Sequence, residues 1–177
     1  VEYQEDVFVG YRYFETIPGA AASVCYPFGY GLSYTTFALS DVRGGMNGAG
    51  EIALSATVTN TGLCAGKYVL QAYVNPPKGR IAKPATALVG FAKTRLLEPN
   101  ESETLMVSFA PYAFATYDDE GAVRKSAYVM EKGAYGFRVG ENVRETVNVD
   151  YRYELDDDAI LEQLSPKCAP TLLHRRM

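Results

Sequence analysis

Tryptophan is absent from the 177-residue sequence, histidine occurs once and cysteine three times. The single histidine, His174, has no partner histidine, cysteine cluster or serine motif, so we interpret it as structurally incidental. The cysteines are Cys25, Cys64 and Cys168. An odd number without CxxC spacing argues against a disulfide framework and favours a reducing cytoplasm. Cys64 follows a turn in a predicted loop, and we interpret it as an inert thiol.

Long apolar runs and a basic surface are also missing. No apolar run reaches about 18 residues, so the sequence predicts no transmembrane helix and no membrane partner. There are 17 Lys and Arg against 21 Asp and Glu, a formal net charge of −4, which predicts no nucleic-acid partner. Lys167, Arg175 and Arg176 form no dense basic patch and are interpreted as solvated. The opening residues resemble neither a signal peptide nor a natural start, so we expect them to come from the middle of a longer protein.

The composition otherwise favours a β-rich globular protein. Hydrophobic residues make up 47% of the chain, which is enough to bury a core. Fourteen tyrosines suit strands, whereas 16 glycines and nine prolines suit many turns. The sequence therefore predicts an all-β fold.

Strand patterns recur at regular spacing between residues 35 and 153, which indicates a two-sheet sandwich. The pattern predicts strands over Thr36–Val42, Glu51–Thr59, Lys67–Val74, Thr86–Leu97, Thr104–Phe109, Val123–Met130, Tyr135–Val139 and Glu145–Tyr153, with a short hairpin at Glu131–Gly133. Alternation along the strands predicts a core that contains Leu54, Val58, Leu70, Val74, Leu105, Val107, Phe109, Phe137 and Val139. The Cys–Trp–Cys pattern of antibody domains is missing.

Two further elements are predicted outside this region. Val7–Phe14 reads as a strand that is apolar on both faces, so it must fold back on the sandwich, pair with a second copy or aggregate. Asp156–Asp158 precede Ile160, Leu161 and Leu164, and a proline follows. This pattern predicts a short C-terminal helix, with a linker after it.

The carboxylates show no recognisable catalytic or metal-binding pattern. Glu5, Asp6 and Glu15 flank the opening strand and are interpreted as its solvated ends. Asp118, Asp119 and Glu120 lack the spacing of a calcium loop and are interpreted as a plain turn.

No nucleotide loop is predicted either. Gly133, Gly136 and Gly140 have no strand–GxGxxG–helix context. The sequence therefore assigns no catalytic, cofactor-binding or metal-binding residue, and no cofactor.

The stretch Pro27–Phe37, PFGYGLSYTTF, is dense in glycine and aromatic residues and separates two unlike parts of the chain. It closely resembles the junction in glycoside hydrolase family 3, β-glucosidase-like enzymes, where an α/β sandwich domain is followed by a fibronectin type III-like domain. The string VGYRYF resembles a late strand of that α/β domain. VTNTG, GKYVLQAYV, LVGFAKTRLLEPNE and GAYGFRVG then follow in the family's order. The resemblance covers roughly residues 1–149.

The resemblance implies a domain division and an accessory role. Residues 1–34 would be the remnant of the α/β domain with the junction, residues 35–153 a fibronectin type III-like (immunoglobulin-like) β-sandwich, and residues 154–177 a short helix and a linker tail. The tail resembles the connector to a catalytic barrel in family members with permuted order. In the family, a retaining mechanism uses an aspartate in an SDW-like motif of the barrel and a glutamate upstream in the α/β domain. The SDW-like motif does not occur here, and the family's glutamate would lie upstream of the strand preserved here. The resemblance therefore implies no catalytic residue in this chain and no hydrolysis by the chain alone.

The expected partners are the other domains of a parent glycoside hydrolase and, through that enzyme, its carbohydrate substrate. Two other classes of function stay open. A carbohydrate-binding module usually displays an aromatic platform that commonly includes tryptophan, which this chain lacks. A protein-interaction module that forms a homodimer would instead display a large exposed apolar patch.

Overall fold

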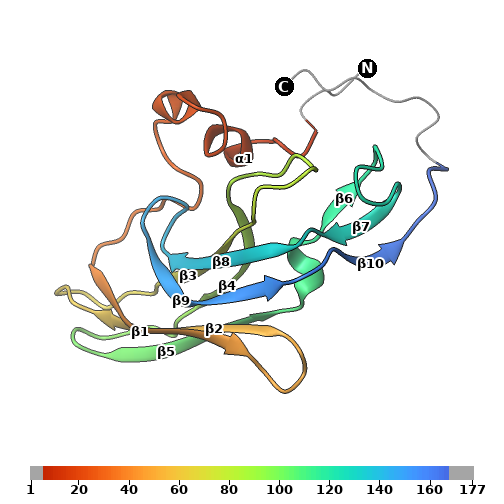
Figure 1. The fold of residues 1–177 in the computed structure, drawn as a ribbon. Coiled ribbons are helices and arrows are strands. Elements are labelled where there is room, and N and C mark those ends of the chain that lie inside the picture. Colours follow the sequence, from red (N-terminus) through yellow and green to blue (C-terminus); the bar gives the residue numbers. More distant parts are fainter. Residues whose placement is uncertain (1–5, 168–177) are drawn as a thin grey trace.

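The computed structural model describes residues 6–167, and two antiparallel sheets form its centre (Figure 1). The first sheet has the order β1-β2-β5 and contains β1 (Phe37–Met46), β2 (Ile52–Asn60) and β5 (Ser102–Phe109). The second has the order β4-β3-β8-β9 and contains β3 (Val69–Asn75), β4 (Ala87–Lys93), β8 (Gly133–Gly140) and β9 (Thr146–Leu155). The all-β sandwich predicted from the sequence is therefore confirmed.

A smaller sheet extends the sandwich at one end (Figure 1). Its order is β10-β7-β6, from β6 (Thr116–Asp118), β7 (Ala127–Met130) and β10 (Ala159–Gln163). A 3-10 turn, η2 (Pro111–Phe114), leads from β5 into it. The sequence did not predict β6, because three residues are too few for a periodic pattern.

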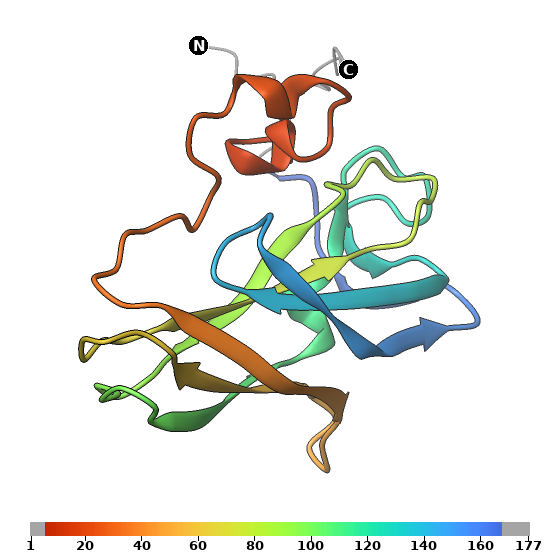
Figure 2. The same cartoon turned by 90° about the vertical axis from the view of Figure 1, so that its left-hand side faces the viewer.

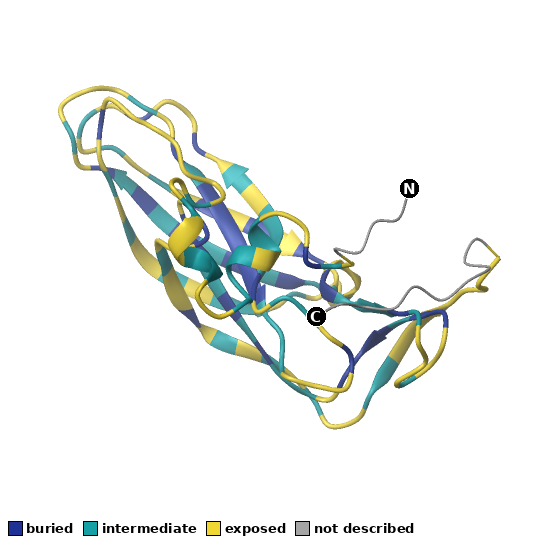
Figure 3. Cartoon of the chain, turned by 90° about the horizontal axis from the view of Figure 1, so that it is seen from above, coloured by how far each residue is buried: buried dark blue, intermediate teal, exposed yellow. Residues whose placement is uncertain are grey.

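The core between the two larger sheets follows from alternation in the strands. In β2, every second residue from Ile52 to Asn60 is buried, and Figure 3 shows the same alternation of buried and more exposed positions along several strands. All nine predicted core residues are buried, so this prediction is confirmed. Phe114 adds an aromatic contact that the sequence pattern did not reveal, with ring centroids 5.7 Å from Phe137 and 6.1 Å from Phe109.

The N-terminal segment is helical where a strand was predicted. Val7–Phe14 contains α1 (Tyr11–Phe14), preceded by Gly10 at a φ of 60°, and a second short turn follows, η1 (Ala20–Ser23). The strand prediction is wrong because no neighbouring strand among the described residues offers backbone partners to this segment. Local bonds satisfy its backbone instead, such as Glu15 N to Tyr11 O at 2.8 Å. The segment nevertheless folds back on the sandwich, as one of the predicted outcomes required (Figure 2).

The C-terminal helix prediction is also wrong. Residues 159–163 form β10, which pairs antiparallel with β7. A helix of this length gains little from its own hydrogen bonds, whereas β7 presents an unpaired edge. The Gln163 amide secures the strand by donating to the carbonyls of Lys125 and Ser126.

The hairpin predicted at Glu131–Gly133 does not form, because β7 and β8 belong to different sheets. Glu131 lies where the chain crosses between them and is buried. The first predicted strand is longer than expected: β1 continues past Val42 through two glycines, with a register shift between Ser40 and Arg43.

Candidate functional site

The N-terminal segment is attached to the sandwich through side chains from α1 and the turn after it. The ring of Tyr11 stacks on Phe28, with centroids 4.2 Å apart and planes at 17°. Its hydroxyl accepts a hydrogen bond from the Leu88 amide at 2.8 Å, at the start of β4. Thr16 Oγ1 accepts another from the Ala85 amide at 2.9 Å. These contacts, between residues 69 and 77 positions apart in sequence, therefore fix the segment over the β3–β4 connection and the start of β4.

The β8–β9 loop also holds this segment. Arg144 Nε donates to Glu15 Oε1 at 2.9 Å, and its Nη2 donates to the Ala21 carbonyl at 3.2 Å. The Val143 amide donates to the Phe28 carbonyl at 3.0 Å. The interpretation of Glu15 as a solvated strand end is wrong, because this ion pair leaves its side chain only 14% exposed.

Gly29, in the junction, lies close against the Gln71 side chain of the sheet and has a left-handed backbone conformation. Its carbonyl accepts a bond from Gln71 Nε2 at 3.3 Å, and the Gln71 amide also donates to the Glu141 carbonyl. A Cβ at Gly29 would lie 2.2 Å from Gln71 Oε1, and its φ of 87° strains other residues. The junction is therefore a shaped crossing, as its glycines and aromatics predicted.

Beside these anchored groups, the junction exposes large apolar side chains. Leu32 is 91% exposed and Tyr34 is 99% exposed. The other exposed apolar residues of this segment are Val9, Tyr13, Tyr26, Phe28 and Tyr30. We call this set the junction face. Contiguous exposed apolar patches are typical of interaction sites, and these seven side chains are all exposed on one segment of the chain.

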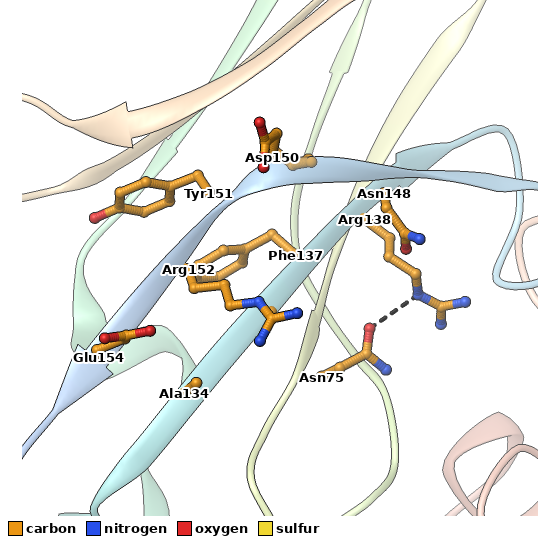
Figure 4. Close-up of a pocket in the computed structure, with 11 residues that line it drawn as sticks. Asn75, Ala134, Phe137, Arg138, Asn148, Asp150, Tyr151, Arg152 and Glu154 are labelled. Atoms are coloured by element: carbon orange, nitrogen blue, oxygen red, sulfur yellow. Dashed lines mark hydrogen bonds between the residues drawn. The ribbon is translucent and has the colours of Figure 1, made fainter.

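A hollow of about 640 Å³ lies on the outer face of β8 and β9, opposite the core (Figure 4). Arg138, Arg152 and Asn75 border it, and Arg138 Nε donates to Asn75 Oδ1 at 2.9 Å. Gly136 lines the hollow. No atom lies within 4 Å of where its Cβ would be, so a side chain at this position would fit and would fill part of the hollow. Glycine in a strand costs about 0.5–1 kcal/mol relative to alanine, and here it keeps the hollow deep.

A second hollow joins the first to the N-terminal segment. It has a volume of about 450 Å³ and shares Asn75 and Arg138 with the first, and Glu15 and Arg144 also line it. Through Glu15, the N-terminal segment therefore borders a hollow that continues onto the outer face of β8–β9.

The other carboxylates considered in the sequence analysis, and Gly140, lie in turns or at the ends of elements. Asp118 accepts backbone N–H groups from Gly121, Ala122, Val123 and Arg124 at 2.7–3.0 Å. Burial acts to raise the pKa of Asp118, but these four donors outweigh it and hold the pKa below its usual value. The buried Asp118 carboxylate thus stabilises the turn that follows it. Asp119 and Glu120 lie in that turn, Asp6 is exposed at the described N-terminus, and Gly140 ends β8.

The remaining sequence candidates lie apart from this surface or outside the described residues. Cys25 and Cys64 are exposed free thiols, and Lys167 is exposed. Glu5, Cys168, His174, Arg175 and Arg176 lie outside the described residues. Within residues 6–167, no three His, Cys, Asp or Glu side chains are grouped so that they could hold a metal ion. The same residues contain no helix that is long and apolar enough to cross a membrane.

Glu131 is a buried charge that the sequence pattern did not reveal. Its carboxylate binds Lys83 Nζ and Arg80 Nε, and the Arg80 amide donates to it at 2.7 Å. Asp158 binds the other side of Arg80 and accepts from the Lys132 amide at 2.9 Å. These contacts join the β3–β4 connection, the β7–β8 crossing and the start of β10. Only a prediction of contacts about 50 residues apart would have found this cluster.

Comparison with known proteins identifies the domain. Residues 68–143 match the sequence profile of the fibronectin type III-like domain. The chain is 48% identical over 191 aligned positions to β-glucosidase A of Butyrivibrio fibrisolvens, covering 100% of this chain and 23% of that protein. It is 42% identical to a β-glucosidase of Ruminococcus albus, covering 99% of this chain and 18% of that protein.

Solved structures agree with these relatives. A β-glucosidase from Paenibacillus barengoltzii superposes with a TM-score of 0.83 at 44% identity, covering 92% of this chain and 18% of that one. β-Glucosidase 3B from Thermotoga neapolitana, solved with α-D-glucose, superposes with a TM-score of 0.78 at 37% sequence identity. The match covers 90% of this chain and 21% of that one. The chain spans about a fifth of these proteins, so other parts of the same polypeptide accompany this region in them. The chain thus contains a fibronectin type III-like domain and corresponds to the region that surrounds this domain in the β-glucosidases of glycoside hydrolase family 3.

Proposed function

We propose that this chain is the accessory region of a β-glucosidase-like enzyme and supports that enzyme's other domains. In this proposal, residues 1–34 are the end of an α/β domain and residues 35–153 are the sandwich, which the end of β9 and the strand β10 extend into residues 154–177. Retaining hydrolysis of a glycoside would be carried out by residues outside this chain. The role of the sandwich is to hold the neighbouring domain in place.

The observation that carries the proposal is the two-sided N-terminal segment. One side is fixed to the sandwich by Tyr11, Thr16 and the Glu15–Arg144 ion pair. The same segment also leaves the side chains of the junction face exposed to solvent. The relatives contain further sequence that could contact the junction face, since about four-fifths of their length lies outside the aligned region.

The proposal is tested by placing charge on the junction face of the full-length parent enzyme. Leu32→Asp combined with Tyr34→Asp should lower both the melting temperature and the turnover of nitrophenyl glucoside, because a buried unpaired charge is costly. Met106→Asp is the matched control, because Met106 is exposed on the outer face of β5 in the opposite sheet. Equal melting temperatures for the unchanged enzyme, the double variant and Met106→Asp would show that the junction face contacts nothing in the parent enzyme.

The same surface favours a homodimer when the rest of the parent enzyme is absent. The junction face offers apolar area that two copies can cover together. Light scattering of this chain should therefore report a dimer that the Leu32→Asp and Tyr34→Asp changes dissociate. A monomer at all concentrations would contradict this.

We also propose a cytoplasmic location, on the strength of the odd cysteine count and the two exposed free thiols. Thiol titration of protein isolated from its native cells under alkylating conditions should find all three cysteines reduced. A disulfide in that sample would contradict the proposal.

A further inference from the structure

Three tyrosines from separate elements form a connected group on the smaller sheet. Tyr112 comes from η2, Tyr117 from β6 and Tyr128 from β7. The Tyr128 ring lies between the others, with centroid distances of 5.0 Å to Tyr112 and 5.4 Å to Tyr117. The planes are tilted by 45° and 56°, so the rings form a twisted strip. We call it the tyrosine strip.

The pairing of the strands places this strip on the face turned away from the interior. Tyr128 stands directly opposite Tyr117 of β6 and Glu162 of β10, so the three form one row across the sheet. The neighbouring residues of β7, Ala127 and Val129, are fully buried in the small core on the other face. Tyr112 is 45% exposed, and Tyr117 and Tyr128 are partly exposed.

A carboxylate stands at the edge of the strip. Glu162 Oε2 accepts a hydrogen bond from the Tyr112 hydroxyl at 2.5 Å. This bond, more than any other contact, raises the pKa of Tyr112 to about 12, so the hydroxyl stays protonated at neutral pH. The bond fixes the ring, and Glu162 retains a second oxygen that can accept a bond from a ligand.

The size and charge of the strip decide which ligands suit it. A tyrosine offers about 150–250 Å² when fully covered, so three partly exposed rings offer roughly 200 Å². A stable protein partner covers about 800 Å² on each side, which is far more. The negative Glu162 disfavours phosphates and other anions. A neutral ligand fits both conditions when it has flat C–H faces for the rings and hydroxyl donors for the carboxylate.

We propose that the tyrosine strip is a binding platform for a short neutral glucan, in which sugar rings pack against the exposed parts of the tyrosine rings, Tyr112 above all, and a sugar hydroxyl donates to Glu162. The choice of a glucan among hydroxyl-rich ligands rests on the proposed function, since a β-glucosidase-like enzyme acts on glucosides. The platform is a non-catalytic site, separate from the junction face.

The test is an NMR titration of the ¹⁵N-labelled 177-residue chain with cellotetraose. The expected result is saturable shifts at residues of η2, β7 and β10, with a dissociation constant of about 1 mM or below. Tyr112→Ala should weaken binding by about tenfold or more, because one stacked ring is lost. Tyr112→Phe keeps the ring and should weaken binding less, and Glu162→Gln should weaken it measurably. Melting curves establish that each variant is folded.

Phe91→Ala is the matched control, because Phe91 is an exposed aromatic residue on β4 of another sheet. The Phe91→Ala variant should bind cellotetraose with the same affinity as the unchanged chain. Absence of saturable shifts would overturn the inference, as would binding that Tyr112→Ala leaves unchanged. Binding of a proline-rich peptide, but not of cellotetraose, at the same tyrosines would also overturn it. None of these outcomes involves the junction face, so the proposed accessory role is judged separately.

Discussion

Replacing Glu131 by glutamine removes the charge at the centre of the buried ion cluster with little change of shape. The Glu131 side chain is 4% exposed and that of its partner Lys83 is 6% exposed. After the change, Lys83 would be a buried ammonium group without its counter-ion. Breaking a buried ion pair from one side costs about 3–5 kcal/mol. Since a domain of this kind is stable by about 5–15 kcal/mol, the loss should be large.

The assay is urea unfolding of the chain at pH 7, for Glu131→Gln, Lys83→Met and the double variant. The double variant should lose less than the sum of the single losses, because no unpaired charge remains. Arg95→Ala is the control: it breaks the Arg95–Glu101 pair, whose side chains are 53% and 40% exposed, and should leave the free energy of unfolding almost unchanged. A loss below about 1 kcal/mol for Glu131→Gln would refute the reasoning.

The same variant has a defined pH dependence. Burial acts to raise the pKa of Glu131, but Lys83 and the Arg80 and Ile81 amides outweigh it and lower the pKa from its ordinary value of 4.5. A lowered pKa in the folded state stabilises the protein above the ordinary value, and this contribution is lost as the pH falls through the folded value. The stability difference between the unchanged chain and Glu131→Gln should therefore shrink on acidification.

Three further predictions concern the core, the β8–β9 loop and catalysis. Phe109→Ala should cost about 3–5 kcal/mol in urea unfolding, because Phe109 is buried against Phe114 and Phe137; a loss under 1 kcal/mol would place its ring outside the core. A hydrogen bond to Glu145, with burial, raises the pKa of Glu141 from 4.5 to about 7. The protonated Glu141 carboxyl therefore contributes fully to the stability of the folded chain below about pH 4.5, and this contribution is lost as the pH rises through about 7. Glu141→Gln should remove this slope in melting temperature between pH 5 and 8, and an unchanged slope would assign it to another group. The purified chain should not hydrolyse nitrophenyl glucoside, xyloside or galactoside; turnover that follows the chain through purification would disprove this.

The strands of the sandwich were predictable because their apolar residues alternate and their burial is set locally. Leu54 and Val58 in β2 illustrate this, since period-2 alternation and the buried face coincide. The elements at both ends were not predictable in the same way. Val7–Phe14 has strand propensity without a partner strand, and the acidic start of residues 156–164 favours a helix until β7 offers an open edge. Available partners outweigh propensity in both cases.

The junction was identifiable from sequence because its glycines and aromatic residues lie within eleven consecutive positions. The other features of the surface were not identifiable, because each needs residues distant in sequence. Glu15 and Arg144 are 129 positions apart, and Lys83 and Glu131 are 48 apart. The tyrosine strip likewise depends on the register of β6 against β7, which the sequence pattern does not specify.

Hydrogen–deuterium exchange tests the central claim most directly, by comparing this chain with the full-length parent enzyme. The claim is that residues 26–34 are anchored on one side and contact the parent enzyme's other domains on the other. Amides of this stretch should exchange rapidly in the chain at concentrations where it is monomeric, and at least about tenfold more slowly in the parent enzyme. The amides of β2, in the core of both proteins, should exchange equally and serve as the internal reference. Equal exchange of residues 26–34 in the two proteins would contradict the account.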